Sequence, residues 1–265
     1  MRIKITDDLD LKKIAESGQC FRWESVSDNR YRIVHRDHMV EIEERLDREF
    51  YFSCDEEEFE KVWREYLDLD ENYASIRNRI KKSEDPFLYE ACEYGRGIRI
   101  LRQDPWETLI SFIISQNRNI PAIKKSIRIL CGQTGSSYSF PTPEQILSMS
   151  DEALSECRLG YRDQYILAAA RAVLNGDIVP DDLIDADEET TMRELTSIHG
   201  VGKKVASCMS LFGLHHIDAF PIDVWIRRVL ESKYPDGYPM ESYRPYNGIY
   251  QQYMFYYAQS GAAEL

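Results

Sequence analysis

The chain has 265 residues, of which 43% are hydrophobic and 30% charged, so it is long enough to bury a substantial core and too apolar to be largely disordered. Its apolar runs fall short of the roughly 20 residues of a membrane-spanning helix, and its first residues lack the apolar stretch of a signal peptide, so we expect a cytoplasmic protein with no membrane partner. The net charge of −13 counts against nucleic-acid binding, unless the basic clusters at 124–128, 203–204 and 227–228 act locally.

The six cysteines do not form the usual metal-binding motifs. No two of them make a Cys-x-x-Cys pair, which zinc ribbons and iron–sulfur loops require. We therefore expect no metal and no cofactor, and we expect free thiols that are mostly buried. The cysteines are Cys20, Cys54, Cys92, Cys131, Cys157 and Cys208.

The first 54 residues carry the pattern of β-strands. Residues 31–35, 39–43 and 50–53 alternate in polarity or are rich in β-branched and aromatic side chains, and a short polar turn lies at 27–29. The pattern predicts an antiparallel sheet.

Helical spacing replaces the strand pattern from residue 56 onward. One helix has a clear start, because Asp104 suits an N-cap and Pro105 suits the first turn. The predicted helices span 56–67, 72–82, 86–94, 106–115, 120–130, 163–174, 188–196, 203–212, 222–231 and 243–258, with a loop at 132–143. We therefore expect an α+β protein with a small sheet domain and short helices at 1–98 and a larger helical domain at 99–265.

Gly200 and Gly202 separate two predicted helices within residues 195–213. Two glycines in three residues permit a tight turn and leave bare backbone N–H groups at the start of the next helix, where a phosphate can bind. A helix-hairpin-helix grips DNA in this way without reading its bases. The glycines alone also fit an ordinary pair of antiparallel helices joined by a glycine turn.

A proline and an acid follow this hairpin. Pro221 suits the entry to a helix, and we expect Asp223 in its first turn, where a carboxylate is favoured. The run Gly-Val-Gly-x-Lys-Val-Ala with Pro-Ile-Asp-Val after it resembles the helix-hairpin-helix (HhH-GPD) DNA glycosylase superfamily. Within it, the chain is most similar to the 8-oxoguanine DNA glycosylases, which it resembles in order along nearly its whole length, at residues 17–23, 101–105, 159–162 and 202–208.

The resemblance implies an antiparallel domain packed on two helical lobes, with an active site between the lobes. It also implies a bifunctional glycosylase/lyase that removes 8-oxoguanine from DNA and cleaves the abasic site by β-elimination. Lys204 would attack the sugar C1′ and form a Schiff base, and Asp223 would stabilise positive charge on the sugar. Taken without the resemblance, Lys204 fits a solvent-facing lysine on a helix, and Asp223 fits a helix cap.

Four further residues match the family's base-binding positions. The Gly18 carbonyl would accept the N7–H of 8-oxoguanine, which guanine lacks. Cys208 and Phe255 would contact the two faces of the base, and Gln251 would read its pairing edge, with Gln252 as an adjacent rival. Taken alone, Gly18 fits a turn and Phe255 a helical core.

Three other residues match positions that contact DNA around the orphaned cytosine. They are Asn117, Tyr161, which would wedge into the duplex, and Arg162. They add to the DNA contacts expected at the hairpin glycines Gly200 and Gly202. The chain departs from the vertebrate-type pattern at Ala122, where the family has a second arginine that grips the cytosine. We therefore predict a relaxed preference for the opposite base, with Arg118 as a possible substitute. A smaller departure is Trp225, where the family often has histidine.

Two alternative functions remain open. One is another glycosylase of the superfamily, acting on oxidised pyrimidines, alkylpurines or adenine. The other is a non-catalytic helix-hairpin-helix module, which needs no lysine–aspartate pair. In every case the expected partner is double-stranded DNA, with oxidised guanine in the favoured case, and the resemblance implies a monomer.

Overall fold

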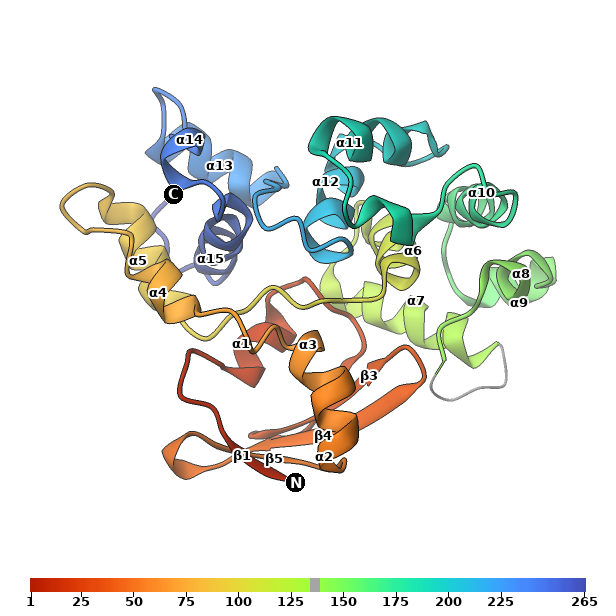
Figure 1. The fold of residues 1–265 in the computed structure, drawn as a ribbon. Coiled ribbons are helices and arrows are strands. Elements are labelled where there is room, and N and C mark those ends of the chain that lie inside the picture. The colour runs from red at the N-terminus through yellow and green to blue at the C-terminus, as the bar shows by residue number, and fades with distance from the viewer. Residues whose placement is uncertain (134–138) are drawn as a thin grey trace.

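Five antiparallel strands form the N-terminal sheet (Figure 1). The structure, a computed structural model, describes residues 1–133 and 139–265. Tyr31 pairs with Ile42 and Ile33 with Val40, so these buried apolar side chains share one face of the sheet. The strands in spatial order are β1 (Arg2–Lys4), β5 (Glu49–Phe52), β4 (His38–Glu44), β3 (Arg30–His35) and β2 (Trp23–Ser27).

Two helical segments cover the buried face of the sheet. One is α1 (Leu11–Glu16), and the other runs from α2 (Glu56–Glu58) through a π-helical turn (Phe59–Trp63) to α3 (Arg64–Tyr66). Both pack into the core that the strands bury. The predicted helix at 56–67 is confirmed, whereas α1, β1 and β2 were not among the predicted elements, because segments this short show no clear period.

The rest of the chain is helical, as predicted. The Asp104 carboxylate accepts a hydrogen bond from the Glu107 N–H at 2.8 Å and caps the helix that begins at Pro105. None of the helices in the described residues is both long enough and apolar enough to cross a membrane. The helices are α4 (Tyr73–Arg77), α5 (Pro86–Tyr94), α6 (Pro105–Ser115), α7 (Ile120–Gly132), α8 (Pro143–Leu147), α9 (Asp151–Glu156), α10 (Arg162–Leu174), α11 (Glu188–Ser197), α12 (Lys203–Phe212), α13 (Val224–Lys233), α14 (Met240–Tyr243) and α15 (Asn247–Gln259), with short 3₁₀ segments at Leu46–Arg48 and Pro180–Leu183.

Two predicted helices are too long. The one predicted at 72–82 ends at Arg77, after which the chain continues in tighter i→i+3 turns. The one predicted at 243–258 starts only at Asn247, because Pro245 has no N–H to donate and separates α14 from α15. The short helices α8 and α9 were not predicted, and residues 134–138 of the predicted loop at 132–143 lie outside the described residues.

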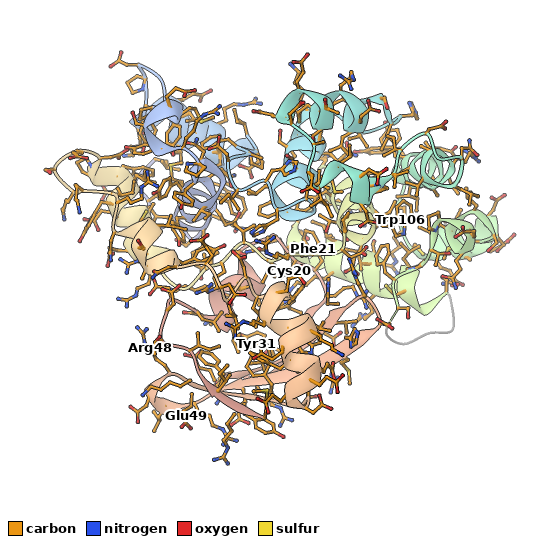
Figure 2. All side chains as sticks on the ribbon, viewed as in Figure 1. Cys20, Phe21, Tyr31, Arg48, Glu49 and Trp106 are labelled. Atoms are coloured by element: carbon orange, nitrogen blue, oxygen red, sulfur yellow. The ribbon has the colours of Figure 1, made fainter. Side chains whose placement is uncertain are left out.

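The described residues form two apolar cores, which meet at residues 20 and 21. Cys20 belongs to the core under the sheet, and the next residue, Phe21, belongs to the core of the helical part (Figure 2). Helices α4 and α5 precede the predicted boundary at 98–99, yet α5 packs against α15 and both contribute to the helical core. The boundary itself falls in the extended segment between α5 and α6.

A buried group of charges ties the N-terminal segment to the helical part. The Asp8 carboxylate accepts hydrogen bonds from Arg77 at 3.0 Å and from Arg96 at 2.9 Å. Burial alone would raise the pKa of the Asp8 carboxyl, but the two guanidinium groups hold it below its usual range. The buried guanidinium of Arg99 donates to the backbone oxygen of Asp8 at 2.7 Å. These bonds connect the segment after β1 to α4 and to the segment that follows α5.

All six cysteines are free thiols, and all except the half-buried Cys54 are buried, as predicted. Burial raises the pKa of every one of them. The pKa reaches about 12 at Cys20 and Cys131 and about 11 at Cys54 and Cys157. It also lies above the ordinary thiol value at Cys92 and Cys208. Each side chain is therefore a neutral thiol near pH 7.

Candidate active site

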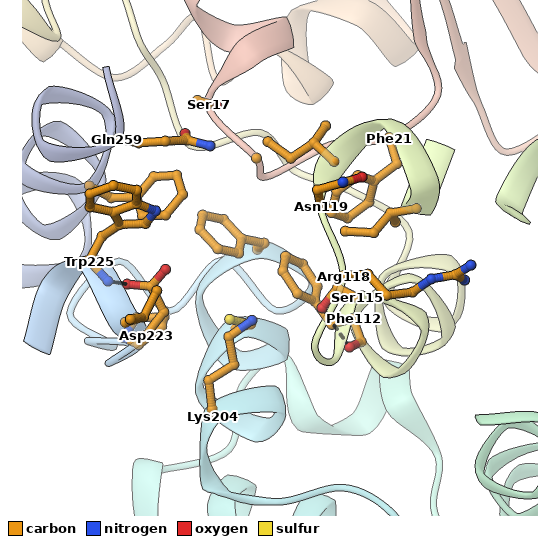
Figure 3. Close-up of a pocket in the computed structure, with 18 of the residues that line it drawn as sticks. Ser17, Phe21, Phe112, Ser115, Arg118, Asn119, Lys204, Asp223, Trp225 and Gln259 are labelled. Carbon is orange, nitrogen blue, oxygen red and sulfur yellow. Dashed lines mark hydrogen bonds between the residues drawn. The ribbon is translucent and has the colours of Figure 1, made fainter. Parts of the chain in front are cut away.

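A cavity of about 450 Å³ lies between α6 and α7 on one side and α13 and α15 on the other, with α12 between them (Figure 3). Its volume falls in the range of roughly 300–1,000 Å³ that is typical of ligand pockets. Phe21, Phe112 and Phe255 contribute aromatic surface to its wall. Lys204 and Asp223 bring charged side chains to the same cavity from two different helices.

The glycine turn sets the start of α12 and therefore the place of Lys204. Gly200 has a φ of +90°, and a Cβ there would lie 2.1 Å from the Tyr165 ring, so no larger residue fits. Gly202 is the N-cap of α12 and offers no side chain to the first N–H groups of the helix. These exposed donors at a positive helix end suit a phosphate, as the glycine pattern predicts.

Lys204 extends from the first turn of α12 into the cavity (Figure 3). Its Nζ lies 5.4 Å from the centre of the Phe112 ring, and the side chain is half-buried. Cys208 follows one turn later on the same helix and also lines the cavity. Burial raises the pKa of the Cys208 thiol, and the nearby Lys204 ammonium offsets part of that rise. Lys203 is exposed and is not part of the cavity wall.

Asp223 is the N-cap of α13, one residue before the helix, and not a member of the first turn as the sequence suggests. Its Oδ1 accepts hydrogen bonds from the backbone N–H groups of Trp225 at 3.0 Å and Ile226 at 2.9 Å. Among the described residues, Oδ2 has no hydrogen-bond partner. One oxygen therefore fixes the carboxylate, and the other is available to a ligand.

The predicted base-binding residues all line this cavity. Gly18 has a φ of +75°, and a Cβ there would lie 3.4 Å from the Phe255 ring, so the Gly18 backbone passes close to that ring. Gln251 is buried, and its Nε2 donates to the Pro221 carbonyl at 2.9 Å. The buried Oε1 of Gln251 has no partner within the described chain, as expected of a group kept for a ligand.

Gln252, the rival of Gln251, also reaches the cavity wall, and both amides donate to a backbone carbonyl, but of the two only Gln251 has a buried oxygen without a partner among the described residues. The Nε2 of Gln252 donates to the Ser17 carbonyl and thereby holds the segment before Gly18. The geometry therefore favours Gln251 as the residue that contacts a ligand, and Gln252 as the residue that positions the neighbouring loop.

The three residues predicted to touch the orphaned cytosine lie outside the cavity wall. Asn117 is exposed with a φ of +52°, and Tyr161 is 53% exposed. Arg162 is only 7% exposed, and its guanidinium donates to the carbonyls of Gln116 at 2.8 Å and Leu159 at 3.0 Å. A contact between Arg162 and DNA stays a prediction, and it requires some of these bonds to be exchanged.

Phe112 and Gln259 are among the cavity residues that were not predicted from the sequence. Phe112 on α6 lies beneath the Lys204 ammonium, but an aromatic residue in an apolar helix gives no local sign of a site. Gln259 ends α15, four residues after Phe255 and eight after Gln251, and it also lines the cavity. That spacing on one helical face was the available signal.

Comparisons with protein families match nearly the whole chain. The model described as "8-oxoguanine DNA glycosylase, N-terminal domain" matches residues 2–109. The model described as "HhH-GPD superfamily base excision DNA repair protein" matches residues 110–235.

Solved structures of similar proteins match both the N-terminal sheet domain and the helical domain of this chain. MBOgg1, in complex with a low-affinity DNA ligand, is 37% identical with a TM-score of 0.91, over 99% of this chain and 96% of that one. The Clostridium acetobutylicum 8-oxoguanine glycosylase/lyase, bound to DNA containing cytosine opposite 8-oxoguanine, is 32% identical with a TM-score of 0.88, over 99% of both chains.

Curated relatives are longer than this chain. The N-glycosylase/DNA lyase of Saccharomyces cerevisiae is 40% identical over 159 residues, which are 52% of this chain and 42% of that protein. The N-glycosylase/DNA lyase OGG1 of Arabidopsis thaliana is 28% identical over 84% of this chain and 66% of its own length. The chain thus spans less than two thirds of the length of these relatives.

Proposed function

This chain belongs to the 8-oxoguanine DNA glycosylase family of the HhH-GPD superfamily, and on that premise we propose that it flips 8-oxoguanine out of duplex DNA, excises it and cleaves the resulting abasic site. One observation carries the proposal. Lys204 and Asp223 line the same cavity, and that cavity is wide enough for a purine and lined by Gly18, Gln251 and Phe255. A non-catalytic DNA-binding module does not need this pair.

Lys204 is the nucleophile in the proposed reaction. After the Lys204 ammonium has given a proton to water, the lone pair of its Nζ forms a bond to C1′ of the flipped nucleotide, and the C1′–N9 bond breaks with its electrons leaving on the base, which takes up a proton. The Oδ2 atom of Asp223 stabilises the positive charge on the sugar as this bond breaks. Loss of a proton from the new amine and opening of the sugar ring give a Schiff base, and removal of a C2′ proton then expels the 3′ phosphate.

The base-binding residues give the proposed pocket its selectivity. The Gly18 carbonyl accepts the N7–H of 8-oxoguanine, whereas guanine presents a lone pair to the same oxygen. An unmet buried pair of this kind costs about 1–3 kcal/mol. Gln251 offers its free Oε1 to the pairing edge of the base. The neutral thiol of Cys208 and the ring of Phe255 provide its two stacking surfaces.

Borohydride trapping tests the proposal. The native chain is expected to form a covalent adduct with a duplex that contains 8-oxoguanine, and Lys204→Gln is expected to abolish it. Lys203→Gln is the matched control, because Lys203 is the exposed neighbour on the same helix. An adduct that survives in Lys204→Gln and disappears in Lys203→Gln would contradict the assignment. A panel of oxidised pyrimidines and alkylpurines separates this substrate from those of related glycosylases.

The second part of the proposal is a relaxed preference for the base opposite 8-oxoguanine. Ala122 supplies no arginine for the orphaned cytosine, and the guanidinium of Arg118 already donates to Ser126 at 2.8 Å and to the Arg158 carbonyl at 3.0 Å. Arg162 is also bonded to backbone carbonyls, so neither Arg118 nor Arg162 can bind cytosine without exchanging some of these bonds. We therefore expect excision opposite A, G and T within about tenfold of that opposite C, since each good bidentate base contact contributes about 1–3 kcal/mol. Single-turnover rates on the four duplexes test this, and strict dependence on cytosine would overturn it.

A further inference from the structure

Gln259 brings an unused side-chain amide to the cavity. It ends α15, is half-buried, and has no hydrogen-bond partner in residues 1–133 and 139–265. Figure 3 shows its side chain reaching over the cavity on the side where Ser17 lies, away from Lys204. An amide carries two donors and an acceptor, and in a partly buried wall these groups are normally satisfied.

The position of Gln259 follows from the spacing of three residues on α15. Gln251, Phe255 and Gln259 follow one another at intervals of four residues, so they share one face, and each lies about 6 Å along the helix axis from the next. The buried Gln251 lies at one end of this row, and Gln259 lies at the other. Gly18 faces the ring of Phe255, the middle residue of the row, and a Cβ at Gly18 would lie 3.4 Å from that ring.

A purine stacked on the Phe255 ring has one edge on the side of Gln251 and the opposite edge on the side of Gln259. If its pairing edge faces Gln251, its five-membered ring points toward Gly18 and Gln259. 8-Oxoguanine carries two groups there that guanine lacks, the N7–H donor and the C8 oxygen acceptor. The Gly18 carbonyl accepts a hydrogen bond and cannot donate one, so the C8 oxygen needs a donor of its own.

We propose that Gln259 supplies that donor, its Nε2–H forming a hydrogen bond to the C8 oxygen of the flipped base. The inference rests on the proposed function and adds a specificity-determining residue to it. In this arrangement the chain reads both marks of the oxidised base. Gly18 detects the added proton on N7, and Gln259 detects the added oxygen on C8.

Binding to three duplexes tests the inference, in a Lys204→Gln background so that the DNA stays intact. One duplex contains 8-oxoguanine, one contains 8-thioguanine, which keeps N7–H but has a sulfur that accepts hydrogen bonds weakly, and one contains a tetrahydrofuran abasic site without a base. Gln259→Met keeps the length of the side chain and removes the amide. We expect it to weaken binding of 8-oxoguanine about two- to tenfold, the effect of one hydrogen bond, with a smaller loss for 8-thioguanine and none for the abasic duplex.

Two further variants test whether the loss of binding comes from the missing amide donor of Gln259. Gln259→Glu has the shape of glutamine without a donor, so its loss on 8-oxoguanine is expected to exceed that of Gln259→Met. Gln133→Met is the matched control, because the Gln133 amide at the end of α7 donates to the Glu156 carboxylate at 3.0 Å and the residue does not line the cavity. It is expected to bind all three duplexes like the parent.

Three outcomes overturn the inference. Equal losses on the 8-oxoguanine and abasic duplexes indicate a contact with the DNA backbone. Equal losses on 8-oxoguanine and 8-thioguanine indicate a contact with another part of the base. Unchanged binding in Gln259→Met and Gln259→Glu indicates that there is no contact. In each case the native chain still traps and excises 8-oxoguanine, so these results differ from a failure of the proposed function, in which trapping itself is absent.

Discussion

Asp223 caps a helix and, in the proposed mechanism, also stabilises the sugar cation. Its Oδ1 caps α13 through two backbone N–H groups, and its Oδ2 is open to the cavity. Capping needs an oxygen acceptor, whereas stabilising a cationic sugar needs a negative charge. Because the two requirements differ, two substitutions at this position can separate them.

Asp223→Asn keeps an acceptor oxygen and removes the charge. We expect it to leave the free energy of unfolding within about 0.5 kcal/mol of the parent, because Asn and Asp cap equally well, and to slow excision about 100-fold or more. Asp223→Ala loses the cap as well and is expected to cost about 1 kcal/mol of stability. Urea denaturation and single-turnover excision measure the two effects. Excision by Asp223→Asn at the parent rate would remove Asp223 from the mechanism.

At the scale of elements, the hairpin between α11 and α12 depends on its two glycines in different ways. Gly200 has a left-handed backbone and lies against the Tyr165 ring, whereas Gly202 has a φ of −90° and nothing within 4 Å of the place of a Cβ. One glycine is therefore required by the fold. The other is required only if a phosphate approaches the start of α12.

Alanine at each glycine distinguishes these requirements. Gly200→Ala is expected to lower the free energy of unfolding by about 2–4 kcal/mol, from steric overlap with Tyr165 and from the strained backbone. Gly202→Ala is expected to cost less than about 1 kcal/mol, because alanine is only a poorer N-cap, and to weaken DNA binding while the fold is retained. Urea titrations and DNA-binding assays on both variants test this. Similar stabilities of the two variants would contradict the steric argument.

The elements around the hairpin could be predicted because their signals are local. Glycine spacing, the proline at 221 and the period of α12 all lie within about thirty residues, and the expected bounds 203–212 are those of the structure. The break between α14 and α15 was missed although Pro245 marks it, because the apolar pattern continues across the proline.

Much of the cavity could not be predicted from local signals. Family resemblance led to Gly18, Cys208, Gln251 and Phe255, each of which the structure brings to the cavity wall, while their roles stay predictions. Phe112 has no distinguishing local pattern, and the spacing that links Gln259 to Gln251 and Phe255 indicates a shared helical face without indicating a cavity, which forms only when α15, α6 and the segment at 17–21 pack together. The buried bonds of Arg162 likewise depend on a loop more than forty residues away.

At the scale of the whole molecule, the sheet and the helices are joined through buried charge. Asp8 has almost no exposed surface, and its partner Arg77 is 8% exposed. Removing one member of such a pair leaves the other buried and uncompensated, which is costly in a low-dielectric interior. This junction sets the place of the N-terminal segment that leads through α1 to Gly18.

Asp8→Asn is therefore expected to lower the free energy of unfolding by about 3 kcal/mol or more. Asp70→Asn is the matched control, because Asp70 pairs with Arg64 on the surface at 2.7 Å and is 72% exposed, and it is expected to cost less than about 1 kcal/mol. Urea denaturation of both variants measures the difference. Equal stabilities would show that the Asp8 group is no more important than a surface pair.

The burial of the thiols affects how readily this protein is oxidised. Thiolates react with peroxides far faster than neutral thiols do, and every cysteine in this chain has a raised pKa. The peroxides that oxidise guanine therefore meet no cysteine with a lowered pKa in this chain. We therefore expect the proposed repair activity to survive peroxide exposure without a reductase that restores oxidised cysteines.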